Sequence, residues 1–252
     1  MKITTWNVNS LKVRLPHVLE YLENEKPDVL ALQETKQQDK DFPQAELEAA
    51  GYHVQFAGQK TYNGVAMISK KEASDMVFDV PNLDDPQRRL LAATIDGVRV
   101  IDVYIPNGQE VGCDKYQYKF RWLNALREFL KTELETHEKL VLLGDYNIAP
   151  ADLDIHDPSR WIEKIMCSTA EREWFFSLMD MGLYDSLRQL HPEDAMHSWW
   201  DYRSNAFRRK WGIRIDHILA TSTLQIQAGG VHIDYRAKER PSDHAPVWAE
   251  LS

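Results

Sequence analysis

Amide, carboxylate, hydroxyl and imidazole side chains recur near the ends of the short apolar segments of this 252-residue chain. The set comprises Asn7, Asn9, Glu34, Tyr104, Asn107, Asp145, Asn147, Asp216, Asp243 and His244. Carboxylates and amides without thiolates form a hard-oxygen environment that suits Mg²⁺ or Mn²⁺ better than Zn²⁺. Because Mg²⁺ is usually held by one or two carboxylates together with substrate phosphate oxygens, the set favours phosphoester chemistry.

Hydrolysis of a phosphodiester requires a positioned water, neutralisation of charge at phosphorus and stabilisation of the leaving alkoxide. Glu34 with one or two partners suffices to hold the cation. Asp145 is a candidate for handling the water, with Asn147 fixing its orientation. His244, held by a carboxylate, can donate to a nonbridging phosphate oxygen. Further neutral donors are Asn7, Tyr104 and Asn107.

Each of these residues, taken alone, has a plainer interpretation. An Asn or Asp after a strand commonly forms a turn through its own backbone. A lone Glu such as Glu34 fits solvated surface, and His244 beside Asp243 fits a local turn. The recurrence of such groups at many strand ends favours a shared site instead. The sequence has no serine nucleophile elbow, no P-loop and no H-E-x-x-H motif that would indicate other chemistry.

The elements that must position these groups are short buried strands alternating with helices. Apolar runs bounded by turn residues predict strands at Ile3–Trp6, Val29–Leu32, Val65–Ile68, Leu90–Ile95, Val98–Ile105, Leu140–Leu143, Ile215–Leu219 and Val247–Leu251. Helical patterns cover Leu11–Lys26, Tyr116–His137 and Thr169–Met181, the last with Ser168 or Thr169 as N-cap. Strands that are apolar on both faces predict a layered α/β domain with helices outside packed sheets.

Composition restricts the class of protein further. The chain is 43% hydrophobic and 27% charged with a formal net charge of −9, which is ordinary for a folded protein. Its only cysteines, Cys113 and Cys167, have no C-x-x-C spacing, and no apolar run is long enough to span a membrane. We expect a single domain over residues 1–252 in the reducing cytoplasm. The excess of acid argues against a general basic coat for nucleic acid, although it leaves local clefts open.

The segment from Asp194 to Arg214 differs from its surroundings because aromatic and basic residues alternate in it. It contains Trp199, Trp200, Tyr202, Arg203, Phe207, Arg208, Arg209, Lys210 and Trp211. Long functional loops have this composition, and a solvated charged loop over a small core is the alternative. Outside this segment, Trp122, Trp161 and Trp174 are expected in the core.

The sequence resembles the exonuclease III family of apurinic/apyrimidinic endonucleases, in the endonuclease/exonuclease/phosphatase superfamily that includes deoxyribonuclease I. The resemblance runs nearly end to end. Its segments, in family order, are Trp6-Asn7-Val8-Asn9-Ser10-Leu11, Pro27-Asp28-Val29, Leu32-Gln33-Glu34-Thr35-Lys36, Tyr104-Ile105-Pro106-Asn107-Gly108, Gly144-Asp145-Tyr146-Asn147-Ile148-Ala149-Pro150, Trp200-Asp201-Tyr202-Arg203-Ser204, Arg214-Ile215-Asp216-His217 and Ser242-Asp243-His244-Ala245-Pro246-Val247. It implies a four-layer α/β sandwich, in which two packed mixed β-sheets are flanked by helices, as in deoxyribonuclease I.

The resemblance also implies roles for individual residues. Glu34 becomes the main Mg²⁺ ligand, with Mn²⁺ as an alternative ion and with Asn7 and Asn9 close by. Asn9 stands where some relatives have Asp, which favours one metal ion over two. At the phosphate, the resemblance implies that Asp145 activates or positions the water with the help of Asn147. Asp243 and His244 form a pair that faces the phosphate, and Asp216 is the carboxylate that orients His244. Tyr104 and Asn107 are hydrogen-bond donors to the phosphate. Whether the base is Asp145, a histidine or a tyrosinate stays open.

In the family, the segment rich in aromatic and basic residues lines a pocket for a deoxyribose that lacks its base. Trp199, Ile213 and Ile215 match that pocket, whose apolar walls suit an abasic sugar and exclude an intact nucleotide. The remaining substrate contacts implied are Arg208, Arg209 and Lys210 to phosphates, Trp211 as a stacking or wedging residue, and His156 near the 3′ side of the substrate. An ordinary loop histidine is the alternative for His156.

The activity implied is Mg²⁺-dependent hydrolysis on the 5′ side of abasic sites in duplex DNA, which leaves a 3′-hydroxyl and serves base excision repair. Trimming and dephosphorylation of 3′ ends are expected as second activities. The partner is double-stranded DNA with abasic sites or 3′ ends, with no membrane and no obligate protein partner, and the chain is expected to be a monomer. The alternatives are a phosphatase or phosphodiesterase acting on a lipid or nucleotide headgroup, and a noncatalytic DNA-binding module on the same scaffold.

Overall fold

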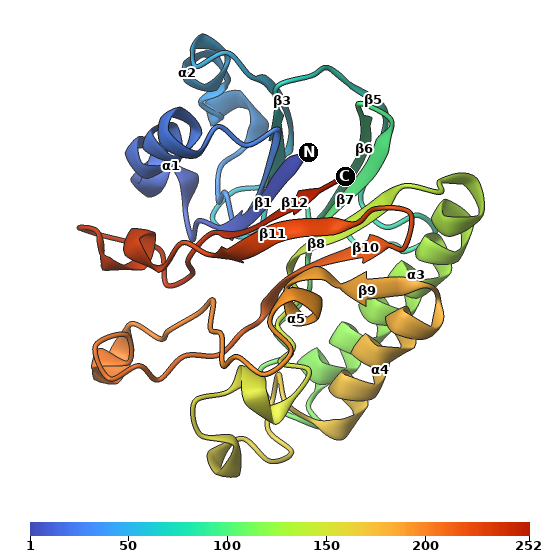
Figure 1. The fold of residues 1–252 in the computed structure, drawn as a ribbon, viewed down its shortest axis with the longest axis vertical. Helices are drawn as coiled ribbons and strands as arrows, with labels where there is room; N and C mark the ends of the chain where they lie inside the picture. Colours follow the sequence, from blue (N-terminus) through green and yellow to red (C-terminus); the bar gives the residue numbers. More distant parts are fainter.

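Two six-stranded mixed sheets pack face to face, with helices outside both of them (Figure 1). The computed structural model describes all residues, 1–252. The first sheet has the order β11-β12-β1-β2-β4-β3 and the second the order β5-β6-β7-β8-β10-β9. In each sheet one central pair is parallel, β1 with β2 and β7 with β8, and the other pairs are antiparallel.

The strands of the first sheet are β1 (Lys2–Asn7), β2 (Val29–Gln33), β3 (His53–Ala57), β4 (Val65–Ser69), β11 (Ile226–Val231) and β12 (Val247–Leu251). Those of the second sheet are β5 (Ala73–Phe78), β6 (Leu90–Ile95), β7 (Val98–Tyr104), β8 (Leu140–Asp145), β9 (Leu183–Asp185) and β10 (Asp216–Thr221). The helices are α1 (Leu11–Glu25), α2 (Gln44–Ala49), α3 (Asp114–Thr136), α4 (Thr169–Asp180) and α5 (Ser186–Leu190). None of them is long and apolar enough to cross a lipid bilayer.

Strand β2 is apolar from Val29 to Leu32 because both of its faces are covered. Val29 and Ala31 pack into the core between the two sheets, whereas Leu30 and Leu32 pack under α1. Successive side chains of a strand point to opposite faces, so a strand covered on both sides needs no polar residue. Helices α1 and α2 cover the first sheet, and α3 and α4 cover the second (Figure 1). The expected four-layer α/β sandwich is therefore confirmed.

All eight predicted strands are present as interior strands of the sheets, and the three predicted helices are α1, α3 and α4. Ser168 caps α4 by accepting from the backbone N–H of Glu171 at 3.3 Å, while Glu171 accepts from the backbone N–H of Ser168. The strands that the sequence does not predict are β3, β5, β9 and β11, which are the four sheet edges.

Candidate active site

The ends of strands from both sheets surround one cavity of about 450 Å³. The predicted residues that line it are Glu34, Tyr104, Asn107, Asp145, Asn147, Trp199, Ile215, Asp243 and His244. They come from widely separated parts of the sequence, because β2, β7 and β8 end at the same edge of the packed sheets. The arrangement brings carboxylates, amides, a phenol and an imidazole to one opening.

The backbone turns sharply where two of these residues follow their strands. Glu34 has φ 52° and Asn147 has φ 50°, both in the left-handed region that residues other than glycine seldom occupy. Such conformations persist where surrounding structure enforces them, and they are frequent at functional sites. Just before Asp145, a side chain at Gly144 would place its Cβ 1.9 Å from the carbonyl oxygen of Val103. Only glycine permits this close approach of β7 and β8.

The buried side chain of Asn7 joins the two carboxylates that belong to different sheets. Its Nδ2 donates to Glu34 Oε1 and to Asp145 Oδ2, each at 2.9 Å. Its Oδ1 accepts from the backbone N–H of Asn9 at 2.9 Å, which settles the orientation of the amide. Asn7 therefore lies beside Glu34, as expected, but directs its nitrogen and not its oxygen toward the carboxylates.

Glu34 is ionised and held by two further contacts. Tyr104 donates its hydroxyl hydrogen to Oε1 at 2.9 Å, and Lys36 Nζ lies 2.8 Å from Oε2. Burial alone would raise the pKa of Glu34, but Lys36 and the Asn7 amide outweigh burial and lower it. Burial and the Glu34 charge raise the pKa of Tyr104 well above its ordinary value, so its hydroxyl stays protonated and acts as a donor.

Asn9 makes no hydrogen bond to Glu34. Its Oδ1 accepts from Lys36 Nζ, and its Nδ2 donates to Asp243 Oδ1 at 2.9 Å. The other oxygen of Asp243 accepts from the indole N–H of Trp199 at 2.9 Å. Asn9 and Asp243 thus link the loop after β1 to the wall of the cavity.

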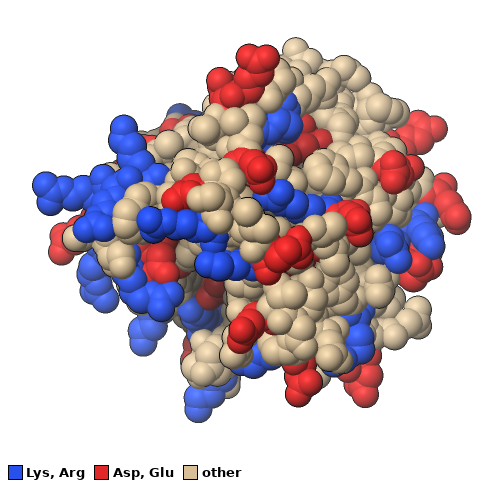
Figure 2. Space-filling view, turned by 90° about the horizontal axis from the view of Figure 1, so that it is seen from below, with Lys and Arg blue, Asp and Glu red and all other residues tan.

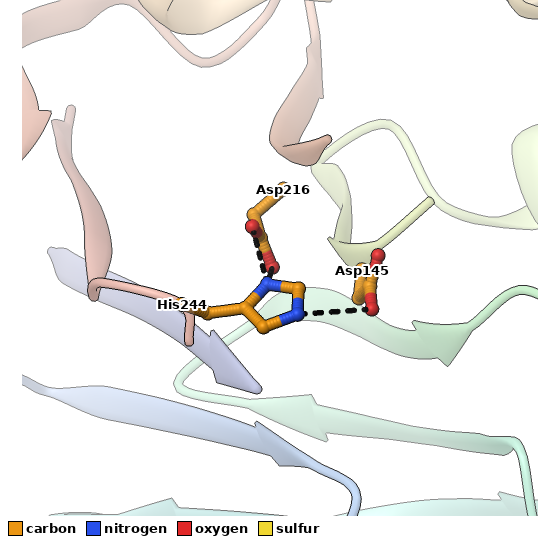
Figure 3. A group of neighbouring side chains, drawn as sticks. All are labelled: Asp145, Asp216 and His244. Atoms are coloured by element: carbon orange, nitrogen blue, oxygen red, sulfur yellow. Dashed lines mark hydrogen bonds and ion pairs between the residues drawn. The ribbon is translucent and has the colours of Figure 1, made fainter. Parts of the chain in front are cut away.

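His244 lies between two buried carboxylates (Figure 3). Its Nδ1 is 2.9 Å from Asp216 Oδ2, and its Nε2 is 3.8 Å from Asp145 Oδ2. Asp216 also accepts from the Ser198 hydroxyl at 2.6 Å. Burial would lower the pKa of His244, but Asp216 and Asp145 outweigh it and raise that pKa, whereas burial raises the pKa of Asp145. The imidazole is therefore a cationic donor. One side-chain ligand atom from each of these three residues lies within 4.8 Å of the others, a spacing that a metal site could also have.

The two asparagines at the other side of the cavity fix each other. Asn107 Nδ2 donates to Asn147 Oδ1 at 2.9 Å, and Asn147 Nδ2 donates to the carbonyl oxygen of Ile105 at 3.0 Å. The backbone N–H of Asn147 donates to Asp145 Oδ1 at 2.9 Å. Asn147 therefore fixes one oxygen of Asp145 and leaves the other facing Asn7 and His244.

The donor set fits a hard divalent cation at Glu34. The carboxylate is ionised, its side chain is 18% exposed, and it lines the cavity together with Asp145. Because Mg²⁺ usually keeps several waters and takes one or two carboxylates, an ionised carboxylate that is open on one side to water fits this ion. Lys36 is the cation nearest to Glu34 Oε2, so a bound metal would compete with it for the same oxygen.

Apolar side chains form the remaining wall. Trp199 pairs through its backbone with Ile213 on one side and His244 on the other. Trp199 and Ile215 line the cavity itself, whereas Ile213 is fully buried and lines a neighbouring cavity. The expectation that Trp161 is a core residue is wrong, because Trp161 is half-buried and lines both cavities.

The basic residues expected to contact phosphates lie outside this cavity of about 450 Å³, which we call the catalytic cavity after the role expected for it. Arg208, Arg209 and Lys210 are exposed on the loop that follows η4 (Arg203–Asn205). His156 and Trp211 line the neighbouring cavity of about 310 Å³. Figure 2 shows the molecule from below relative to Figure 1. Lys and Arg side chains gather on one side of that view, and Asp and Glu are scattered over the rest. A basic area therefore exists despite the net charge of −9.

Several lining residues have no role in the sequence-based prediction. They are Gln109, Trp161, Ile165, Met166, Asp201 and Arg203. Asp201 and Arg203 lie in one of the segments that carry the family resemblance, so the sequence already pointed to this part of the chain. Trp161, Ile165 and Met166 lie in an irregular stretch between β8 and α4, where no periodic pattern indicates which side chains face inward.

Two packed mixed sheets, with an ionised glutamate and a buried Asp-His-Asp group at one edge, define a class of metal-assisted phosphoesterases. The chain belongs to the Endonuclease/Exonuclease/phosphatase family, whose model matches residues 4–244. It is 39% identical to Exodeoxyribonuclease III of Haemophilus influenzae, with 100% of both chains covered.

Two solved structures extend this relationship. One is the 3′ phosphatase NExo from Neisseria bound to product DNA hairpin, which is 54% identical with a TM-score of 0.99, covering 100% of this chain and 99% of that one. The other is an AP endonuclease from Archaeoglobus fulgidus, which is 37% identical with a TM-score of 0.96, again covering 100% of this chain and 99% of that one. The similarity thus extends over the whole chain.

Proposed function

We propose that the chain is a DNA-repair nuclease that hydrolyses the phosphodiester 5′ to abasic sites in duplex DNA and leaves a 3′-hydroxyl. The observation that carries this proposal is the single cavity that holds Glu34, Asp145 and His244 beside the apolar walls of Trp199 and Ile215. The apolar walls suit a sugar without its base, and the polar groups suit the adjoining phosphate. The likeness to an exodeoxyribonuclease and an AP endonuclease supports the same reading.

The residues divide the reaction between them. A divalent cation held by Glu34, Mg²⁺ in the first place and Mn²⁺ as the alternative, would neutralise charge on the phosphate. Asp145 accepts a proton from water, whose oxygen bonds to phosphorus while the bond to the 3′ oxygen breaks. The 3′ oxygen then takes up a proton from solvent. His244 donates from Nε2 to a nonbridging oxygen, and Asp216 keeps its ring in place. Asn107 adds a neutral donor through its second amide hydrogen, and Tyr104 adds one when its hydroxyl turns from Glu34 to the phosphate.

A second activity at 3′ ends is favoured by a separate observation. The relative at 54% identity is named a 3′ phosphatase, and the one at 39% is named an exodeoxyribonuclease. Removal of a 3′-phosphate or a 3′-nucleotide uses the same phosphoester chemistry at a strand end. We include both in the proposed function, with base excision repair in the cytoplasm as the setting. One chain carries every residue of the cavity, so a monomer without a protein partner suffices.

The test compares duplexes that carry a tetrahydrofuran abasic analogue, a recessed 3′-hydroxyl or a 3′-phosphate, each with Mg²⁺ or with chelator. Incision on the 5′ side of the analogue that depends on the metal is the expected result. The headgroup alternative predicts hydrolysis of a soluble phosphodiester to a phosphomonoester and an alcohol, or release of phosphate from a soluble phosphomonoester, and no cleavage of DNA. The noncatalytic alternative predicts binding of the duplex without cleavage under any condition, and either result overturns the proposal.

A further inference from the structure

A second cavity opens beside the catalytic one and shares part of its wall. It has a volume of about 310 Å³, and its lining includes Trp161, Trp199, Asp201 and Arg203, all of which also line the catalytic cavity. The rest of its wall includes His156 and Trp211. An aromatic recess therefore lies directly beside the catalytic cavity, and four residues belong to the lining of both.

The recess is held by hydrogen bonds between two loops. The backbone N–H and the ring Nδ1 of His156 both contact the carbonyl oxygen of Gly212, at 3.1 and 3.2 Å. The rings of His156 and Trp211 are nearly parallel, with centroids 5.9 Å apart and an interplanar angle of 21°. The guanidinium of Arg209 lies 4.7 Å from the centroid of Trp211 on the loop rim. These contacts hold the rings of His156 and Trp211 in place in the lining of the recess.

Two of the polar residues in its lining, Asp201 and Arg203, are engaged with each other, and the other two are His156 and Ser204. Arg203 Nη2 lies 2.6 Å from Asp201 Oδ2, and the Arg203 backbone N–H donates to Asp201 Oδ1 at 2.8 Å. A ligand would thus meet aromatic faces and few free hydrogen-bonding groups. Aromatic side chains stack on any nucleobase, because every base presents a π-face. The recess is suited to a planar ring and not to one particular base.

We infer that this recess binds the base of the 3′-terminal nucleotide while that nucleotide is removed. The inference rests on the proposed activity at 3′ ends. When the scissile phosphate lies at Asp145 and His244, the terminal sugar lies against Trp199 and its base must leave the DNA stack. Trp161 and Trp199 line both cavities, so the recess is adjacent to the position of this sugar. An abasic sugar and a 3′-phosphate have no base and make no use of it.

The test is the ratio of two rates in one variant. We expect Trp211→Ala to lower kcat/KM for removal of a 3′-terminal nucleotide by roughly 5- to 150-fold relative to kcat/KM for the 3′-phosphate, a range that corresponds to about 1–3 kcal/mol. Taking the ratio within one preparation cancels any loss of folded protein. The matched control is Phe176→Ala, which removes an exposed aromatic side chain from α4. An unchanged ratio in Trp211→Ala would overturn the inference.

A second measurement locates the base directly. A duplex ending in 3′-terminal 5-iodouridine is bound to Asp145→Asn protein, irradiated and digested for mass spectrometry. Crosslinks within residues 156–161 or 199–211 are expected, whereas crosslinks confined to other segments would overturn the inference. Failure of the wild-type protein to remove 3′-phosphate would overturn the proposed 3′-end activity itself. Normal 3′-end activity with an unchanged ratio and distant crosslinks would reject the recess alone.

Discussion

The ammonium nitrogen of Lys119 lies 2.8 Å from the backbone carbonyl oxygen of Asn147, with the Lys119 side chain fully buried. The same nitrogen is 3.3 Å from the carbonyl oxygen of Asn107 and forms an ion pair with buried Glu171. Glu171 in turn accepts from the backbone N–H of Met166 at 3.1 Å. One buried cation thus connects three loops that line the catalytic cavity.

We expect Lys119→Met to lower the free energy of unfolding by about 3–5 kcal/mol, because it leaves the Glu171 charge buried without a partner. Since Asn147 loses a backbone contact, kcat should fall as well. Urea denaturation and kcat at saturating DNA measure the two effects. The control is Lys131→Met, whose exposed ion pair with Glu128 on the same helix is worth less than about 1 kcal/mol. Equal stabilities of the two variants would contradict the role of Lys119.

A double variant separates stability from positioning. Glu171→Gln removes the charge but keeps an oxygen that can accept from the start of α4, so Lys119→Met/Glu171→Gln should regain part of the lost stability. We expect kcat to stay low in the double variant because the carbonyl of Asn147 still lacks its donor. Recovery of kcat together with stability would show that Lys119 acts only on folding.

The carboxylates of the cavity should matter for rate and not for binding of DNA. Glu34→Gln and Asp145→Asn are each expected to lower kcat by about 100-fold or more, since they remove the proposed metal ligand and the proposed acceptor of the water proton. Dissociation constants from fluorescence anisotropy, measured with chelator, should stay within about threefold of the wild type. Asp180→Asn, at an exposed position on α4, is the control. A parallel loss of binding and rate would indicate misfolding instead.

The sequence predicted the interior of the fold but not its edges. Interior strands such as β8 are covered on both faces, so their apolar runs stand out against the flanking turns. Edge strands β5 and β11 are mostly exposed or partly exposed, and β11 contains Gly229 and Gly230. An edge strand forms because a neighbour offers hydrogen bonds, and that neighbour is distant in the sequence.

The site divides in the same way. Residues at strand ends, such as Glu34 and Asp145, could be predicted because strands of a sheet meet at one edge. Lys119 could not, since its position on a helix looks the same in sequence as that of an exposed lysine. For Trp161, residue type favours the core, but the sequence does not indicate the course of the irregular loop that carries it. The recess around Trp211 depends on contacts between two irregular loops, which no local pattern encodes.

The exposed basic residues on the loop that follows η4 should control the salt dependence of binding to duplex DNA. If Arg208, Arg209 and Lys210 contact phosphates, replacing all three by Gln should reduce the slope of log K against log salt by about 1 for each side chain. Binding to duplex is measured by anisotropy between low and physiological salt. Lys131→Gln/Lys139→Gln, at exposed positions in and just after α3, is the control. An unchanged slope would place the phosphate contacts elsewhere on the molecule.

A buried histidine next to the site should make folding sensitive to acid. His217 on β10 contacts the carbonyl oxygen of Ile148 through Nε2 at 2.8 Å, and burial, followed by the charge of Arg214, lowers its pKa from 6.5 to about 4. Above pH 6.5 His217 is neutral in both states, so its contribution to stability is complete. As the pH falls toward 4, the unfolded chain takes up a proton that the folded protein excludes, and about 3 kcal/mol is lost.

His217→Gln keeps a donor for Ile148 and removes the titration. The wild type should therefore lose about 3 kcal/mol more than the variant between pH 7 and pH 4, as measured by urea denaturation at intervals of half a pH unit. The difference should develop below pH 6.5 and level off near pH 4. The same series with His53→Gln, at an exposed position on β3, serves as the reference for a histidine that the fold does not bury. Parallel curves for the wild type and His217→Gln would mean that other buried groups, such as the ion pairs of Arg214 with Asp154 and Asp185, determine the acid sensitivity.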